Sequence, residues 1–326
     1  MKFPLLLATA SLLALTACGG SGNSNLGPGG GGGGDGGGGD PVVPGGETVD
    51  PGDLPVDGSE TCGGFLCSGD VTNITFEANG PGPGDDVLTL TDLPFDDDPN
   101  GAVFTYYDTI TGDNGIDYDV YTNADTDPIP GFNTYFAIYK ETDGNELRLG
   151  VAAIEGYVPF GYTGAWYDVN DLTQSIPTLG LVEYSGDYAG TLTFDGNSGL
   201  ALTDGAVSMQ VDFTDSKLKG FITDRDIVDT TLAPGITNTE LPNLVLNDTT
   251  ITDGSFEGTV NSYDTDGSVI ESGTYQGFFG GSDASVVGGL VQAIGEFDFD
   301  GAEGSDPEDT YQARDLGVFT ADRQDP

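Results

Sequence analysis

Short turns containing glycine separate runs of alternating apolar and polar residues, and this pattern constrains the fold most. In residues 207–213 (VSMQVDF) every second side chain is apolar, as in a strand with one buried face. Turn sequences lie at 113–115, 143–145, 195–197, 253–254 and 266–267 and carry Asp or Asn beside Gly. Such pairs favour the left-handed backbone of tight hairpins. The pattern predicts an all-β fold, a small antiparallel β-barrel of about eight strands.

The first residues are typical of an exported lipoprotein. Residues 1–17 hold Lys2 and then a leucine-rich run, shorter than the 18 or more apolar residues of a membrane span, which predicts a cleaved signal peptide. The junction at 15–18, Leu-Thr-Ala-Cys, resembles a bacterial lipobox. It implies cleavage before Cys18 and a diacylglycerol anchor with further acyl (palmitate-like) chains there. Gly19, where Asp would indicate inner-membrane retention, favours the outer membrane. An ordinary signal peptide with a free cysteine is the alternative.

A glycine- and proline-rich segment follows the lipobox. Residues 18–60 include a run of glycine at 29–39 broken only by Asp35, and then scattered prolines and acids. This composition cannot bury a core, so we expect a flexible tether with a root-mean-square reach of roughly 35 Å.

The two remaining cysteines, Cys62 and Cys67, are expected to form a disulfide in an oxidising compartment. The loop is short, so the bond would pin the start of the folded region and stabilise it modestly. Two free thiols and a metal site are the alternatives. A metal site would need further thiolates or imidazoles, which the chain lacks, and we therefore expect no metal.

The charge and the missing histidine exclude several classes of function. A formal charge of −46, from 54 acidic and 8 basic residues, repels nucleic acid. Without histidine there is no Ser-His-Asp or Cys-His triad and no imidazole ligand for zinc or haem. No nucleophile elbow or phosphate-binding loop occurs, so we expect no catalytic residues, no cofactor and no enzyme. A hydrolase built on two carboxylates in an acidic cleft is a weaker alternative.

The region after the tether divides into two parts. Residues 61–157 are a β-rich N-terminal region, and residues 158–326 are expected to form the barrel. For residues 71–157, two arrangements stay open: a separate sheet beside the barrel, or additional strands of the same barrel.

Several motifs in the second part occur together in one known family. They are 173–180 (TQSIPTLG) followed by Tyr184, Gly186 and Gly190; 211–213 (VDF); 256–259 (FEGT); 273–280 (GTYQGFFG); and 286–289 (VVGG). Together they resemble the β-barrel of the transferrin-binding protein B family of bacterial surface lipoproteins, in its single-lobe form. The motifs describe a scaffold of turn glycines and inward aromatic residues. The resemblance would make residues 61–157 a handle-like region, although no motif of the family is matched there.

The resemblance implies a function in binding. We expect an outer-membrane, surface-exposed lipoprotein whose loops bind an external iron- or haem-carrying protein or similar solute, without catalysis. An outer-membrane transporter would be a second partner. The family contacts its partners through loops and a handle sheet that this sequence does not match, so no ligand-binding residue is assigned. A structural or adhesive surface lipoprotein that uses the same barrel is the alternative.

Overall fold

The computed structural model describes β-strands over most of the second half of the chain and part of the first. The described residues are 61–62, 65–66, 73–77, 83–91, 102–123, 135–142, 147–154, 160, 162–169, 176–195, 199–229, 236, 239–297 and 310–324. Cys18 and Cys67 lie outside them, so the lipidation and the Cys62–Cys67 disulfide stay predictions. Among the described residues, no helical segment has the length and hydropathy of a membrane span.

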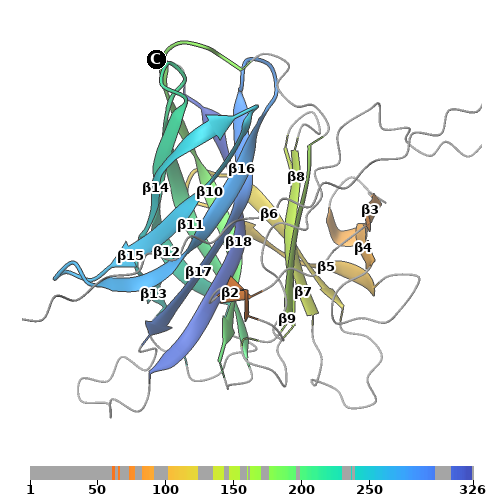
Figure 1. Ribbon diagram of the computed structural model, residues 1–326. Helices are drawn as coiled ribbons and strands as arrows, with labels where there is room; N and C mark the ends of the chain where they lie inside the picture. The colour runs from red at the N-terminus through yellow and green to blue at the C-terminus, as the bar shows by residue number, and fades with distance from the viewer. Residues whose placement is uncertain are drawn as a thin grey trace, which may run out of the picture. The chain divides into compact units, whose positions relative to one another are not determined.

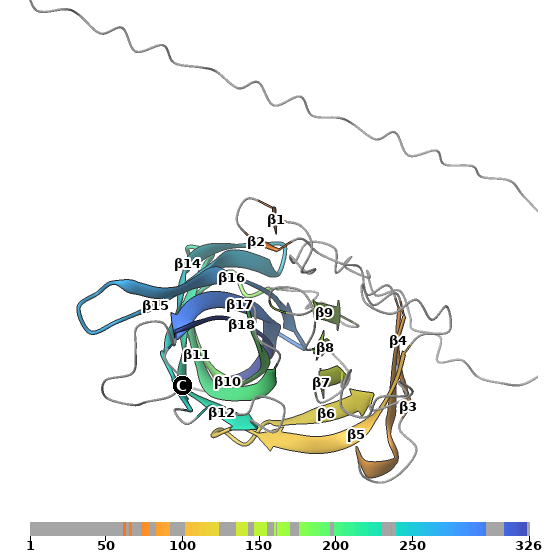
Figure 2. The same ribbon diagram turned by 90° about the horizontal axis from the view of Figure 1, so that it is seen from below.

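Eight antiparallel strands close into a barrel (Figures 1 and 2). They are β10 (Leu181–Phe194), β11 (Leu200–Asp212), β12 (Lys217–Asp229), β14 (Leu244–Thr252), β15 (Ser255–Tyr263), β16 (Val269–Gly280), β17 (Val286–Phe297) and β18 (Tyr311–Arg323). The short β13 (Glu240–Leu241) pairs with β12. The ring closes because β10 pairs with both β11 and β18, and β11 pairs with β12.

A second antiparallel sheet contains the preceding strands in chain order. They are β3 (Asn73–Glu77), β4 (Val87–Thr91), β5 (Ala102–Thr111), β6 (Asp117–Asn123), β7 (Tyr135–Glu141), β8 (Leu147–Ile154) and β9 (Tyr162–Val169). The 3-10 turn η2 (Pro83–Asp85) precedes β4, and a two-stranded ladder joins β1 (Thr61–Cys62) to β2 (Phe65–Leu66).

The alternation predicted for 207–213 is confirmed. Val207, Met209 and Val211 are buried inside the barrel, whereas Ser208 is exposed. The aromatic residues Tyr275 and Phe279 of β16 point inward with them, as the motif analysis expects. These residues belong to one apolar cluster, and a second, smaller cluster of barrel-strand residues includes Leu192 and Ile227.

A second core lies between the outside of the barrel and the seven-stranded sheet. Val120, Ile138 and Val151 of that sheet pack with Leu290 of β17 and Leu316 of β18. These two barrel strands are consequently buried on both faces. The mostly apolar sequence of β17 follows from this double burial, whereas β18 also carries the buried polar residues Arg314, Asp315 and Thr320.

A hydrogen-bonded anchor joins the β5–β6 hairpin to β10. The buried Asp187 carboxylate accepts hydrogen bonds from the backbone N–H groups of Asn114 and Ile116, at 2.9–3.1 Å. The Asn114 side-chain amide donates to the Gly186 carbonyl at 2.7 Å. A Cβ at Gly112 would overlap the Asp187 side chain, so the hairpin needs glycine there.

The all-β fold and the eight-stranded barrel predicted from the sequence are confirmed. Of the two arrangements left open for residues 71–157, the described strands adopt the separate sheet. The first barrel strand starts at Leu181, later than the expected start of the barrel at residue 158, because β9 pairs with β8 along its whole length.

Candidate functional site

One end of the barrel, uppermost in Figure 1, is formed by the turns β11–β12, β14–β15 and β16–β17 and by the segment 176–180. The Gly180 carbonyl accepts the Phe213 N–H at 2.9 Å, and the Gly254 carbonyl accepts the Phe279 N–H at 3.0 Å. Ile176 packs against the interior core beside Gly254. The segment and the turns are thus tied to one another.

One turn of this end, between β14 and β15, has the backbone that the sequence predicts. Asp253 and Gly254 have φ values of 49° and 83°, as the predicted Asp-Gly hairpin turn requires. In the β16–β17 turn, Asp283 and Ala284 also have positive φ. Tyr184 donates its buried hydroxyl to the Ala284 carbonyl at 2.6 Å, which holds this turn against the barrel. The surface is therefore preorganised.

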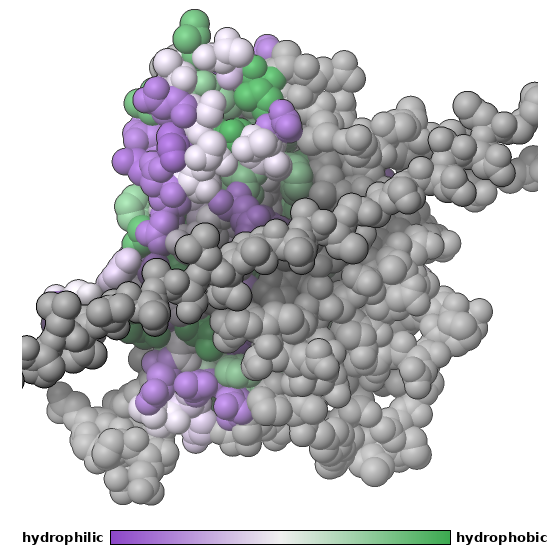
Figure 3. All heavy atoms as spheres, in the orientation of Figure 1, coloured by the Kyte–Doolittle hydropathy of each residue, from purple (hydrophilic) through white to green (hydrophobic). Residues whose placement is uncertain are grey.

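Apolar and acidic side chains meet on this surface. Leu179 is 75% exposed and Leu181 is 62% exposed, the two highest values among the large apolar side chains described. Asp215, Asp253 and Asp283, each in a neighbouring turn, are also exposed. We call these five residues the rim. Figure 3 shows hydrophobic residues among polar ones at this end of the barrel.

Exposed leucines on a rigid backbone are typical of an anchor for a partner protein, because they bury apolar area without losing backbone entropy. The surrounding carboxylates would repel an acidic partner and attract a basic one. Exposed leucines among carboxylates on a rigid backbone therefore support binding of a protein partner.

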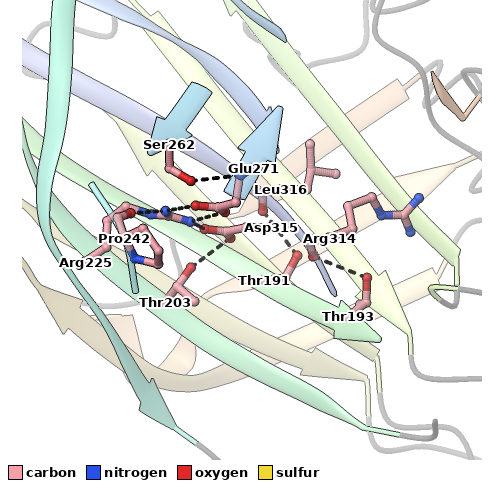
Figure 4. Close-up of polar contacts among 10 residues, drawn as sticks. All are labelled: Thr191, Thr193, Thr203, Arg225, Pro242, Ser262, Glu271, Arg314, Asp315 and Leu316. Carbon is pink, nitrogen blue, oxygen red and sulfur yellow. Dashed lines mark hydrogen bonds and ion pairs between the residues drawn. The ribbon is translucent and has the colours of Figure 1, made fainter. Parts of the chain in front are cut away.

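The barrel interior holds a charged cluster of Arg225, Glu271 and Asp315 (Figure 4). The Arg225 guanidinium donates to Glu271 at 2.8 and 3.2 Å and to Asp315 at 2.7 Å, and it also donates to the Pro242 carbonyl. All three charged side chains are at most 1% exposed. The cluster joins β12, β16 and β18 across the barrel.

Neutral polar groups complete this cluster. Thr203 donates its hydroxyl to Asp315 at 3.0 Å, and the Ser262 hydroxyl accepts the Glu271 N–H at 3.0 Å. Burial disfavours the charged guanidinium, but the carboxylates of Glu271 and Asp315 outweigh it and raise the pKa of Arg225 above its usual value. Both carboxylates are thus engaged by one permanent cation.

These two carboxylates do not form the acidic cleft that a glycosidase-type mechanism needs. Such a mechanism requires one protonated acid and one free carboxylate, both reached by substrate and water. Here both acids face the same guanidinium inside the closed barrel. The cluster is a structural tie between strands, and the sequence had not singled out any of its members.

No set of three Asp, Glu, Cys or His side chains within the described ranges is placed to hold a metal ion. In the β15–β16 turn, Asp264 accepts the Thr265 N–H at 2.6 Å and Asp266 accepts the Ser268 N–H at 2.8 Å. The hydrogen bond from Ser268 lowers the pKa of Asp266. These carboxylates stabilise the turn.

Comparison with known proteins adds a family assignment for the barrel. The sequence profile of the family described as C-lobe and N-lobe beta barrels of Tf-binding protein B matches residues 176–323. This range starts at Ile176 of the end segment and includes every strand from β10 to β18. The barrel is similar to the β-barrels of transferrin-binding protein B. The matched residues contain the whole rim.

Several solved structures of transferrin-binding protein B have chains similar to this one. A structure described as a surface lipoprotein is 15% identical, with a TM-score of 0.35, over 57% of this chain and 80% of the other. Transferrin-binding protein B from Haemophilus parasuis Hp5 is 14% identical, with a TM-score of 0.38, over 83% and 57%. The isotype 1 protein from Neisseria meningitidis is 16% identical, with a TM-score of 0.33, over 82% and 55%. No curated protein matches the chain.

The sequence did not assign ligand-binding residues in this transferrin-binding protein B-like barrel. The 176–180 segment was visible as a family motif, but the exposure of Leu179 was not. A leucine after a proline-containing turn has the same local pattern whether it packs inward or projects outward. The neighbouring Ile176 does pack on the core.

Proposed function

We propose that this chain is a surface lipoprotein, anchored in the outer membrane through Cys18, that captures an external protein with the rim of its barrel. The lipobox and the tether of residues 18–60 support the anchor. The tether would allow the barrel to work at a distance from the lipid. The match of residues 176–323 to the transferrin-binding protein B barrels supports capture in place of catalysis.

One observation carries the proposal: Leu179 and Leu181 project from a preorganised end of the barrel and are surrounded by exposed aspartates. We infer a partner that presents an apolar pocket with basic residues around it. The solved relatives named for transferrin binding suggest an iron- or haem-carrying protein as this partner. An outer-membrane transporter would then receive the cargo.

The test is a pull-down with the full chain, carrying biotin within residues 18–60, in the fluid that surrounds the organism. A receptor retains one protein species through a high-salt wash, since a desolvated apolar contact is not screened by salt. The variant with Leu179→Asp and Leu181→Asp should lose that species. Val228→Asp, which changes an apolar side chain that is 48% exposed on β12, is the matched control and should retain it.

Two outcomes contradict the proposal. Retention of only basic proteins that elute with salt would indicate a charged, adhesive or structural surface protein. Retention of one species equally by the wild type and the double leucine variant would place the binding surface away from the rim.

A further inference from the structure

A groove of about 420 Å³ lies on the outer wall of the barrel over β10, β11 and β12, below the rim. Its outward-facing lining consists of two rows of residues, each running across the three strands, with a polar first row and an aromatic residue in the second. The first row is Glu183, Gln210 and Lys219, and the second is Ser185, Ser208 and Phe221. These side chains point outward because they alternate with the interior residues Tyr184 and Met209.

Lys219 differs from the other surface cations that the structure describes. Lys140, Arg148, Lys217 and Arg323 each bind an acidic side chain or a backbone carbonyl within 3.3 Å. Within the described part of the chain, the Lys219 ammonium makes no hydrogen bond or ion pair. In a protein with a charge of −46, a cation that is not engaged by an acidic side chain is available to a ligand.

The rest of the groove offers complementary polar groups and one aromatic face. Glu183 supplies a carboxylate, Gln210 an amide and Ser208 a hydroxyl. The ring of Phe221 is 47% exposed beside them. Neighbouring strands are about 4.8 Å apart, so the row from Glu183 to Lys219 spans on the order of 10 Å. This spacing fits two linked sugar rings, whose hydroxyls can both donate and accept hydrogen bonds along the row.

Other classes of ligand fit this surface less well. Glu183 and the charge of the whole chain oppose a polyanion. An apolar molecule or an acyl chain would leave the charged and amide groups desolvated without partners. A peptide cannot add a strand here, because β10, β11 and β12 are each paired on both sides.

We propose that this groove binds a neutral oligosaccharide, with one sugar face stacked on Phe221 and the hydroxyls bound by Glu183, Gln210 and Lys219. A sugar ring carries apolar C–H groups on its face and hydroxyls at its edge, which matches an aromatic surface beside a row of polar side chains. This site is separate from the rim and does not depend on the partner proposed for it.

The test is saturation-transfer NMR on the full chain with maltotriose, N,N′,N″-triacetylchitotriose and lacto-N-tetraose as neutral probes. The acidic probes are 3′-sialyllactose and a heparin disaccharide. We expect at least one neutral probe to bind at or below about 10 mM. Phe221→Ala should weaken that binding by about tenfold, and Gln210→Ala or Lys219→Gln by about threefold to tenfold.

Val228→Ala is the matched control, because Val228 lies on the same strand with nearly the same exposure but outside the groove. It should leave binding unchanged, and thermal unfolding should be the same for all variants. The proposal is overturned if no neutral probe binds. It is also overturned if only acidic probes bind, or if Phe221→Ala and Gln210→Ala both bind like the wild type.

Discussion

The two sides of the barrel wall have the same hydrogen-bonded ladder but different surroundings. On the side that contacts the seven-stranded sheet, Leu290 and Val291 are neighbours in β17, and both are at most 1% exposed. On the open side, Val260 of β15 is buried, whereas the adjacent Thr259 is exposed. The sequence of β15 therefore alternates where water covers the outer face of the strand, whereas β17 is mostly apolar on both faces where a second layer covers it.

The interior cluster connects these two sides, since Arg225 belongs to the open-side strand β12 and Asp315 to the covered-side strand β18. The two sides of the barrel thus differ in how their outer faces are covered. Inside the barrel, the Arg225 cluster connects strands of both sides. The contribution of each region to the unfolding free energy can be measured separately. The variants below change the interior, each outer face, and the anchor between the barrel and the second sheet.

The largest effect is expected for Arg225→Met, which leaves Glu271 and Asp315 buried without their cation. Breaking a buried ion pair in this way costs about 3–5 kcal/mol of unfolding free energy, because an uncompensated charge stays in the interior. Urea unfolding at neutral pH measures it. A combined variant that also carries Glu271→Gln and Asp315→Asn should recover part of the loss. A loss below about 1 kcal/mol for Arg225→Met would show that the cluster does not link the two sides.

Leu290→Ala on the covered side should cost about 2–4 kcal/mol, because it opens a cavity between the barrel and the second sheet. Thr259→Ala, at an outward position on the open side, is the control and should change the unfolding free energy by less than about 0.5 kcal/mol. Equal effects of the two substitutions would contradict the assignment of one covered and one open side.

Asp187→Ala tests the anchor of the β5–β6 hairpin. It removes the acceptor of the Asn114 and Ile116 N–H groups, and we expect a loss of about 1–3 kcal/mol. Hydrogen exchange at these two amides should accelerate more than exchange within β15. Asp195→Ala, an exposed aspartate after the end of the same strand, is the control. Unchanged exchange at the Asn114 and Ile116 amides would rule out the anchor.

The smallest effect is expected at Asp204, which faces outward on β11 beside this hairpin. Burial, and then the charge of the paired Asp226, raise its pKa from 3.8 to about 6; Asp113 and Asp187 add to this. The folded state therefore holds the proton more tightly than the unfolded chain. The contribution of protonated Asp204 to the unfolding free energy is fully present below pH 3.8 and is lost as the pH rises through about 6.

Asp204→Asn removes this titration. At pH 7 it should raise the unfolding free energy by about 1 kcal/mol, a value reduced for solvent screening at a half-buried site. The difference between variant and wild type should shrink toward pH 4. A difference that is independent of pH would contradict a raised pKa. Asp195→Asn, at an exposed position after the end of β10, serves as a control for the general effect of removing one negative charge.

Local sequence patterns were sufficient to predict a strand and a turn of the barrel. The period of two in residues 207–213 predicts which side chains enter the core, and the Asp-Gly pair at 253–254 predicts a tight hairpin. Both signals act over a few residues. The inward glycines Gly277 and Gly289 were likewise visible in the sequence, and the structure gives their reason: a Cβ on Gly289 would overlap the neighbouring strand at Gly277.

The contacts between distant segments were not visible in the same way. Arg225 meets Glu271 and Asp315 only because closing the barrel brings β12, β16 and β18 around one interior. The pairing of β9 with β8, and not with a barrel strand, likewise depends on which long-range ladder has the lower free energy. Strand periodicity tells an inner face from an outer one, but the outer face of a strand is covered or open only through residues far away in the chain. The exposed leucines of the rim follow from the same rule, since tertiary packing partly buries Ile176 and leaves Leu179 in solvent.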